Sequence, residues 1–484
     1  MSITTFFCNA FRQIPHAPLG AVVGNPCVAM TQSVQMPTKL AAVVLCSLGL
    51  PLTAQTADEP VAVFTEHPRL LLRPQRLRLL KRERERSSAR WQQFEALVAG
   101  GAPMPERGFA WGLYSMVAGN SALAREALVL AQTGDLDLRE QALVFDWCQN
   151  LMSDSQRRDL AARLQKGIAD TAADNSVAAT RTRAMAAIAL YDHVPQVPQR
   201  ELERIVRQWW GARILPALKR GQSVIARDDA YPLWELLHVI RDNTNIDLRE
   251  TVPRFFKDYP IEHLMSHYPA TYEGPDNQYR IGLSKSGEPD LHLAALSRAA
   301  ELAMVALDTN AAESQVLQGW LMHDHFVLRG PFGAPYEFLW ANPYQPGLSY
   351  NLVPLVYHNP DFGKLFIRSS WDEDAQWFGL FDGSMQLFAD GHPSSVNPRL
   401  DTPPISLTSA TLCFAQRQRK FQLKLDEDEM VFLLGLEPRR TYQVEIDDEE
   451  MFETAADAGG ILELDVPHGK PVGVRIREVP TESR

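Results

Sequence analysis

The spacing of apolar residues changes once along the chain, near Pro346, and this change most restricts the possible folds. From about residue 68 to residue 340, apolar residues recur at intervals of three and four, which is typical of amphipathic α-helices. After Pro346, short runs rich in β-branched and aromatic residues alternate in period two, which is typical of strands. We therefore predict a multidomain protein in which a helical part precedes a β-rich part.

The clearest predicted helix covers residues 199–221, where the apolar residues lie on one helical face. Gly221 can adopt the left-handed conformation that ends a helix. Further helices are predicted over residues 91–98, 109–117, 123–132, 139–152, 156–172, 177–192, 231–241, 291–307 and 313–328. Consecutive short helices with short connections are expected to pair as antiparallel hairpins.

Strands are predicted in the C-terminal part over residues 365–370, 376–381, 429–434, 441–446, 461–466 and 472–477. In the last run, Val472, Val474 and Ile476 alternate with Gly and Arg, so they should face one side of a sheet. This alternation indicates a half-buried antiparallel strand.

The N-terminal residues contain a pattern typical of a secretory signal peptide. Lys39 precedes an apolar run at residues 40–52, which small residues follow at 53–54. The run is shorter than the roughly 18 residues needed to cross a bilayer, so no permanent membrane span is expected. We predict a leader at residues 1–54, with Met30 or Met36 as possible true starts, and a chain exported to the periplasm or secreted.

Charge and cysteine content exclude several classes of protein. Removing residues 1–54 leaves 46 basic against 59 acidic residues, a net charge of −13, so nucleic acid is not an expected partner. Beyond the leader only Cys148 and Cys413 remain, and no disulfide framework follows. Cys148 lies in an apolar segment and is predicted to be a buried, inert thiol.

No cofactor is expected, because the chain has no phosphate loop, dinucleotide glycine motif, nucleophile elbow or Cys/His zinc pattern. No metal is expected either, since His323 and His325 would point to different faces of a helix. Residues 69–90 carry nine Lys or Arg against two Glu, which would suit an anionic ligand or simply a solvated helix face. We expect the solvated face. The oligomeric state stays open.

Polar, aromatic and ionisable residues concentrate at 227–243 and 263–280, where the functional site is predicted. Aromatic rings can stack on sugar faces, while Arg, His and Asn can bind hydroxyls or carboxylates. The alternative is an irregular loop whose tyrosines cover the helical core. The candidate substrate-binding residues are Glu235, His238, Arg241, Asn243, Tyr268, Tyr272 and Asn277.

The helical part starts with His67-Pro-Arg-Leu, and the segment at residues 366–383 contains an Arg368-Ser-Ser-Trp371 motif. Together with the helical body, these features resemble the heparinase II/III-like polysaccharide lyases. The resemblance covers most of the mature chain. It implies an incomplete (α/α) toroid over residues 60–345 and a C-terminal antiparallel β-sandwich-type domain over residues 346–484. It also implies a polysaccharide as substrate or ligand.

Lyases of this family cleave uronate-containing glycans by β-elimination, and the resemblance implies that Tyr279 is the catalytic tyrosine. It likewise relates Glu235 to a glutamate on a core helix. A tyrosine is a poor base at neutral pH unless a cation or a donor stabilises its phenolate. His267 and Arg280 are near enough in sequence to do so and join Tyr279 as catalytic candidates.

One departure from the family leaves the activity open. The family's Asn-Asn-His reads Asp228-Asp229-Ala230 here, and a charged Asp repels a uronate carboxylate. Three functions therefore stay open: a polysaccharide lyase, a catalytically inactive glycan-binding or cell-surface protein, and a glycoside hydrolase using Asp229 and Glu235 as acid and base. Asp229 is the fourth catalytic candidate.

Overall fold

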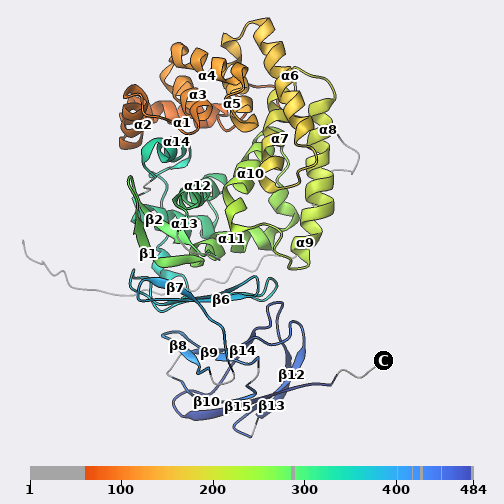
Figure 1. Cartoon of the computed structure of the whole chain (residues 1–484), viewed down its shortest axis with the longest axis vertical. Helices are drawn as coiled ribbons and strands as arrows, with labels where there is room; N and C mark the ends of the chain where they lie inside the picture. Colours follow the sequence, from red (N-terminus) through yellow and green to blue (C-terminus); the bar gives the residue numbers. More distant parts are fainter. Residues whose placement is uncertain are drawn as a thin grey trace, which may run out of the picture. The chain divides into compact units, whose positions relative to one another are not determined.

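The computed structural model describes residues 60–284, 289–325, 328–399, 402–416, 418–425, 429–448 and 450–480. Residues 59–484 form one compact unit. Its first part is helical and its second part is built of sheets, which confirms the predicted order (Figure 1). The predicted signal peptide lies outside the described residues, so export stays a prediction.

Fourteen α-helices are described in the first part: α1 (Pro74–Glu85), α2 (Ala89–Ala99), α3 (Arg107–Ala118), α4 (Ser121–Thr133), α5 (Leu138–Cys148), α6 (Asp154–Asp170), α7 (Val177–Leu190), α8 (Val197–Glu203), α9 (Leu215–Lys219), α10 (Ala230–Thr244), α11 (Pro253–Met265), α12 (Leu291–Leu307), α13 (Ala312–His323) and α14 (Gly330–Trp340). Alternate helices contact one another in succession, from α3 through α5, α7, α10 and α12 to α14, and α14 contacts α3. An (α/α) toroid requires such contacts, and the toroid itself stays a prediction.

The helix predicted at residues 199–221 is confirmed, but its middle has an unexpected pitch. Helical structure continues from α8 through a π-helix at Arg204–Ile214 into α9, and Gly221 has a φ of 71°. The apolar face is buried, with Trp209 and Trp210 at its centre. The period-based prediction therefore located the element and its end, while the wider turn was not visible in the spacing.

A β-hairpin lies where sequence analysis predicted no strands. Its strands are β1 (His267–Glu273) and β2 (Gln278–Gly282), and Tyr272 lies opposite Tyr279 in the antiparallel register. Along the chain, the hairpin follows α11 and precedes α12. It places the second predicted site block on a regular element rather than on a loop.

In the second part, the described residues form three sheets. The first has the order β3 (Val356–Asn359), β4 (Lys364–Arg368), β5 (Trp377–Phe381), β6 (Ser384–Ala389) and β7 (His392–Ser395). The second is β14 (Leu462–Leu464), β11 (Met430–Leu434), β9 (Ala410–Phe414) and β8 (Ile405–Leu407), and the third is β10 (Lys420–Lys424), β15 (Pro471–Glu478), β12 (Thr441–Ile446) and β13 (Glu450–Ala455). Strands β9 and β11 are parallel, which departs from the antiparallel sandwich expected.

The three sheets are stacked, and separate apolar cores join them (Figure 1). Leu365 of β4 shares a core with Leu412 of β9, so the first sheet covers the second. Val431 of β11 shares another core with Val474 of β15, so the second sheet covers the third. The other face of the first sheet packs against the helical part. The predicted inward face of the last strand is confirmed, because Val472, Val474 and Ile476 are buried.

The cysteine prediction is also confirmed. Cys148 and Cys413 are free and buried, and burial raises the pKa of each thiol to about 12. Both thiols are therefore protonated and unreactive at neutral pH. No helix within the described ranges has the length and apolar character needed to cross a membrane.

Candidate functional site

Two buried histidines meet where α11 passes into β1, and Arg227 binds both. Its Nη1 lies 3.1 Å from His263 Nδ1, and its Nη2 lies 2.9 Å from His267 Nε2. A guanidinium only donates hydrogen bonds, so both ring nitrogens must be acceptors and both rings are neutral. Burial and the charge of Arg227 lower the pKa of His263 to about 3 and that of His267 to about 4.

Glycine at position 282 makes the approach of Arg227 possible. A Cβ atom at Gly282 would lie 2.0 Å from Arg227 Nε and 2.5 Å from its Cζ. No real Cβ comes so close to another heavy atom, so any other residue here would displace the guanidinium. The hairpin strand β2 and the Arg227 side chain are thus fitted to each other.

Glu301 of α12 lies beside both neutral rings and begins a chain of ion pairs. Glu301 Oε1 lies 3.2 Å from His267 Nε2 and 3.4 Å from His263 Nε2, while Arg298 lies 3.1 Å from Glu301 Oε2. Arg298 and Arg280 both pair with Asp324, the latter at 3.1 Å. We call His263, His267, Glu301 and these three arginines with Asp324 the histidine cluster. Its carboxylates are two and its guanidiniums three, so its net charge is positive.

The histidine cluster contains donor atoms that could hold a metal ion. One atom each of His263, His267 and Glu301 lie within 4.8 Å of one another. However, Arg227 donates to both rings, and Arg298 pairs with the carboxylate. A cation would have to displace one guanidinium and lie beside another, which charge repulsion opposes. The residues therefore do not fit a metal, and its expected absence stays a prediction.

Tyr279 and Asn277 lie on the hairpin beside this cluster. The Asn277 amide donates to the Tyr279 hydroxyl at 3.0 Å, and its oxygen accepts the Arg329 N–H at 2.6 Å. These two contacts fix the orientation of the amide, because its oxygen faces a donor and its nitrogen an acceptor. Tyr279 and Asn277 line a cavity of about 10 Å³ together with Arg280, Arg298 and Glu301. That space suffices for about one water molecule.

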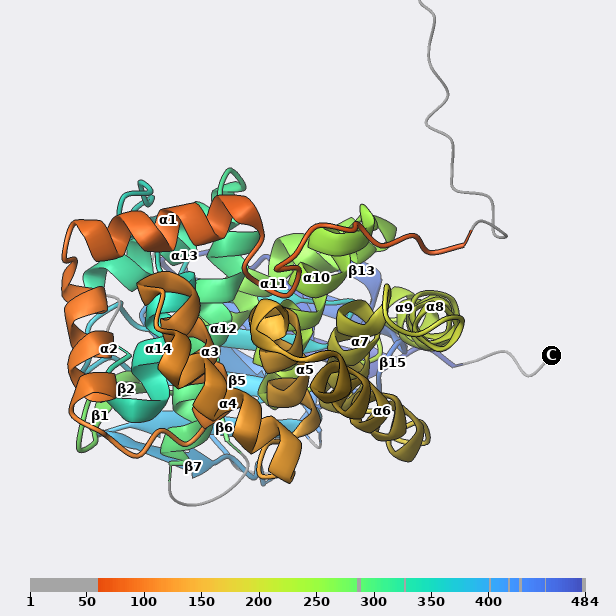
Figure 2. The same cartoon turned by 90° about the horizontal axis from the view of Figure 1, so that it is seen from above.

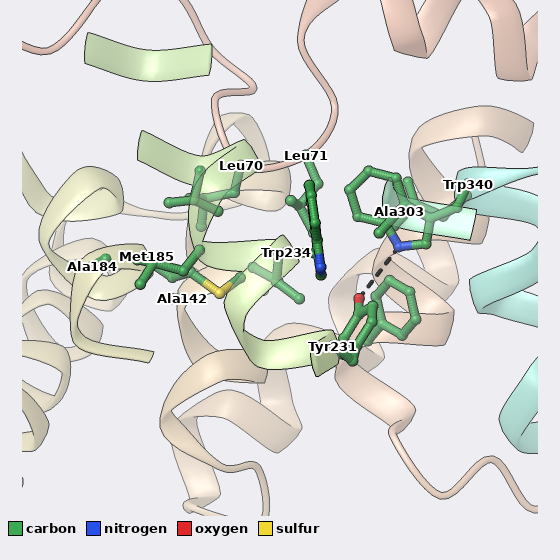
Figure 3. Close-up of a cluster of buried hydrophobic side chains, with 14 of the residues drawn as sticks. Leu70, Leu71, Ala142, Ala184, Met185, Tyr231, Trp234, Ala303 and Trp340 are labelled. Carbon is green, nitrogen blue, oxygen red and sulfur yellow. Dashed lines mark hydrogen bonds between the residues drawn. The ribbon is translucent and has the colours of Figure 1, made fainter. Parts of the chain in front are cut away.

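A second group of charges surrounds Glu235 in α10. Arg139 reaches its two oxygens at 2.6 and 2.8 Å, and Arg181 lies 2.6 Å away. Against the effect of burial, these two arginines lower the pKa of Glu235 to about 2. Tyr231 also donates to Glu235 at 2.8 Å and accepts a hydrogen bond from Trp340 (Figure 3).

This second group, which we call the Glu235 cluster, joins several helices. Arg139 comes from α5, Arg181 from α7, and Glu235 from α10. Glu106, before α3, accepts a hydrogen bond from Tyr336 of α14 at 2.5 Å and pairs with Arg139 at 3.2 Å. The cluster therefore ties five helices together, and its members bind one another.

Three predicted ligand residues on α10 have structural partners instead. His238 is buried against Trp340 and donates to the Ala303 carbonyl at 2.9 Å. Asn243 is buried and donates to the Val239 carbonyl at 2.8 Å within its own helix. Arg241 donates to the Leu307 carbonyl, at the last residue of α12. These three lie away from the histidine cluster, towards the other end of α10.

The remaining candidates lie around the hairpin without joining one groove. Tyr268 is buried and donates to Gln386 of β6 at 2.8 Å, so it links the hairpin to the first sheet. Tyr272 is 44% exposed. Asp229 accepts the Ala226 N–H at 3.1 Å, and burial raises its pKa. Thus His267, Tyr279, Arg280 and Asn277 lie around Glu301, whereas the Asp229 carboxylate binds the Ala226 N–H.

Sequence reasoning missed the residues that hold the histidine cluster together. Arg298 and Glu301 are charged residues three apart in a helix rich in alanine, which is a detectable signal for a buried pair. Asp324 lies between His323 and His325, and nothing in the sequence marks it as the partner of two arginines. Arg227 lies in the predicted block, but nothing in the spacing indicates that it reaches α11.

Arg227 also borders a cavity between the helical part and the first sheet. The cavity has a volume of about 140 Å³. Its polar lining includes Tyr259, His263, Ser266 and Lys364. The space is comparable to one small ring, well below the several hundred Å³ of a typical ligand pocket.

Comparisons with known proteins leave the family open. No protein-family model matches the chain, and no curated protein matches it. Among solved structures, one described as a glycoside hydrolase is similar over 77% of this chain and 71% of that chain, with a TM-score of 0.30 and 9% identity. A likeness at this level carries no argument, so fold and function rest on the chain's own residues.

Proposed function

We propose that the chain is an exported polysaccharide lyase that cleaves an acidic, uronate-containing glycan by β-elimination, with the Tyr279 hydroxyl moving the proton. The observation that carries the proposal is the hydrogen bond from a fixed Asn277 amide to that hydroxyl. A donor aimed at a phenol oxygen stabilises the phenolate that a tyrosine base requires.

The proposed reaction removes the proton from C5 of the uronate, next to its carboxylate. The electrons of that C–H bond form a C4–C5 double bond, the C4–O bond breaks, and the glycosidic oxygen takes up a proton. Nothing is oxidised or reduced. The negative charge that develops at the carboxylate is stabilised by nearby cations. Arg280 and Arg298 lie beside the Tyr279 cavity, in a cluster of net positive charge.

The test is the formation of unsaturated uronate products, followed by absorbance on alginate, heparan, hyaluronan and pectic substrates. We expect Tyr279→Phe to retain folding and glycan affinity while turnover falls by about 100- to 10,000-fold, the usual contribution of a positioned acid or base. Tyr272→Phe is the matched control on the opposite strand. If turnover by Tyr279→Phe equals that of the parent, or if Tyr272→Phe loses as much, Tyr279 has no role in proton transfer.

A second candidate is a glycan-binding protein without turnover, and one observation favours it. Arg280 and Arg298 both pair with Asp324, and Arg227 donates to His263, Ser266, His267 and Ser297. The guanidiniums are therefore engaged by the protein itself. Binding to immobilised glycans with no product on any substrate would support this candidate against the lyase.

The hydrolase is disfavoured by the state of Glu235. As the base of the pair Glu235 would have to take up a proton, whereas Arg139 and Arg181 lower its pKa to about 2 and make it a weak base at neutral pH. Products with reducing ends and no double bond would support the hydrolase instead.

The proposed export is checked by N-terminal sequencing of the chain from the periplasm or medium, which should begin near Gln55. A cytoplasmic chain that keeps Met1 contradicts it.

A further inference from the structure

A groove of about 780 Å³ lies between α1 and the C-terminal ends of α10, α12 and α14. Seven arginines line it, six from residues 73–90 and the seventh Arg241, against the acids Glu66, Glu83 and Asp242. Helix α1 contacts α2 and α3 at one side of the helical part (Figure 2). The groove is therefore a concentrated positive region on a chain whose net charge is −11.

Two of the groove arginines have clear structural partners at helix ends. Arg76 donates to the Leu339 carbonyl at 3.1 Å, and Arg241 donates to the Leu307 carbonyl. Cations there neutralise the negative ends of α14 and α12. Burial lowers the pKa of Arg76 to about 10, despite attraction by Asp242. The helix ends thus explain why these two arginines are present, but they do not explain the other five arginines of the groove.

Most of the positive charge in the groove is not neutralised. Arg90 pairs with Glu83 at 2.6 Å, and Arg241 pairs with Asp242 at 3.0 Å. Within the part of the chain that the structure describes, Arg78, Arg82 and Arg86 form no ion pair. These three are exposed and four residues apart, so they form one row along α1 with a spacing of about 6 Å.

Aromatic and amide groups lie beside this row. The Tyr344 ring is 63% exposed, and the Arg86 guanidinium lies 5.9 Å from its centre. Arg73 Nη1 and Gln345 Oε1 are buried in the groove wall, and neither has a hydrogen-bond partner. Buried polar atoms without partners are unusual in native proteins.

We propose that this groove binds a stretch of acidic polysaccharide, separately from the Tyr279 site. Arg227 precedes α10 and Arg241 lies near its end, so the two sites are about one 15-residue helix apart, or roughly 20 Å. The repeated guanidiniums match anionic groups repeated along a polymer, and the exposed ring and amides match sugar faces and hydroxyls. The choice of a glycan as the ligand rests on the proposed function. The positive charge of the groove is observed independently of that function.

The groove is tested by replacing its exposed row with neutral residues. We expect Arg78→Gln, Arg82→Gln and Arg86→Gln together to weaken binding to immobilised heparan sulfate, alginate or hyaluronan by about tenfold or more. The matched control is Lys81→Gln, Arg125→Gln and Arg158→Gln, which removes three exposed charges outside the groove. Binding should weaken with salt, and neutral dextran should not bind.

The groove and the lyase proposal fail in different ways. Binding is measured in the Tyr279→Phe background, so it does not depend on turnover. If the two triple variants lose glycan binding equally, or if the groove variant loses none, the groove is not the binding site. Equal or tighter binding to single-stranded DNA or to phosphatidylserine vesicles overturns the glycan as occupant. Groove-dependent binding without any product would leave the groove standing and remove the lyase.

Discussion

At the scale of single residues, Arg227 fixes the charge state of the histidine cluster. Because it donates to His263 and His267, neither ring can take up a proton on that side without losing the bond. Glu301 attracts a proton to both rings, but burial and Arg227 outweigh it. Protonation of these two histidines therefore opposes folding.

This competition predicts that the protein loses stability as the pH falls below about 6.5. The unfolded histidines take up protons there, whereas the folded ones resist until about pH 4 and 3. A lowered histidine pKa contributes stability that is present above 6.5 and lost on acidification. Between pH 7 and pH 4.5 the two histidines together should lower the free energy of unfolding by about 5 kcal/mol. Urea unfolding at several pH values measures it.

A variant and its control attribute the slope to the cluster. His267→Gln should flatten the dependence of unfolding free energy on pH. His292→Gln, at an exposed position, should leave the slope as it is. A parent protein whose stability does not change over this range would contradict the assignment of neutral, buried rings.

At the scale of elements, α10 connects the two charge clusters. Arg227 lies just before its first residue, and Tyr231 and Glu235 occupy its first two turns. Glu235 in turn holds arginines from α5 and α7. The helix is therefore fixed by polar contacts at its beginning and by apolar packing further along (Figure 3).

Glu235→Gln should destabilise the protein by about 3 to 5 kcal/mol, because it leaves Arg181 without its counter-charge and the buried Arg139 with Glu106 alone. Thermal or urea unfolding measures the loss. Asp228→Asn, at an exposed position nearby, is the control and should change stability by less than about 0.5 kcal/mol. A loss of activity at parental stability would instead indicate a catalytic carboxylate.

Some elements could be predicted from the spacing of their apolar residues, and others could not. Strand β12 alternates buried and exposed residues, and its predicted bounds are confirmed at Thr441–Ile446. Strand β9, Ala410–Phe414, is buried throughout, so its residues show no alternation. Helices α11 and α14 each contain an internal proline, Pro260 and Pro335, which argues against a helix in sequence analysis.

The sequence predicted the region of the candidate site but not the distant residues that bind there. Tyr279, Arg280, Asn277 and His267 come from one block of sequence, and the hairpin with its flanks keeps them close. Arg227, Arg298 and Asp324 join them only through tertiary contacts between distant segments. Spacing along one sequence does not encode such contacts, so the ion pairs could not be predicted from the sequence.

At the scale of the whole molecule, the first sheet has no face left to solvent along its central strands. In β4, Leu365 and Ile367 belong to the core shared with the second sheet, whereas Phe366 belongs to the core shared with the helical part. Met265 of α11 and Ile281 of the hairpin complete that latter core. Both parts of the compact unit therefore depend on the same strands.

The doubly covered sheet makes the unit cooperative. We expect residues 60–480 to melt in one calorimetric transition, with the calorimetric enthalpy equal to the van't Hoff enthalpy. A fragment ending at residue 345 would expose Met265, Tyr268 and Ile281, and it should aggregate rather than fold alone. Two separable transitions, or a soluble and folded fragment, would contradict this. Exchange of the sheets between related proteins would accordingly require matching changes on α11 and the hairpin.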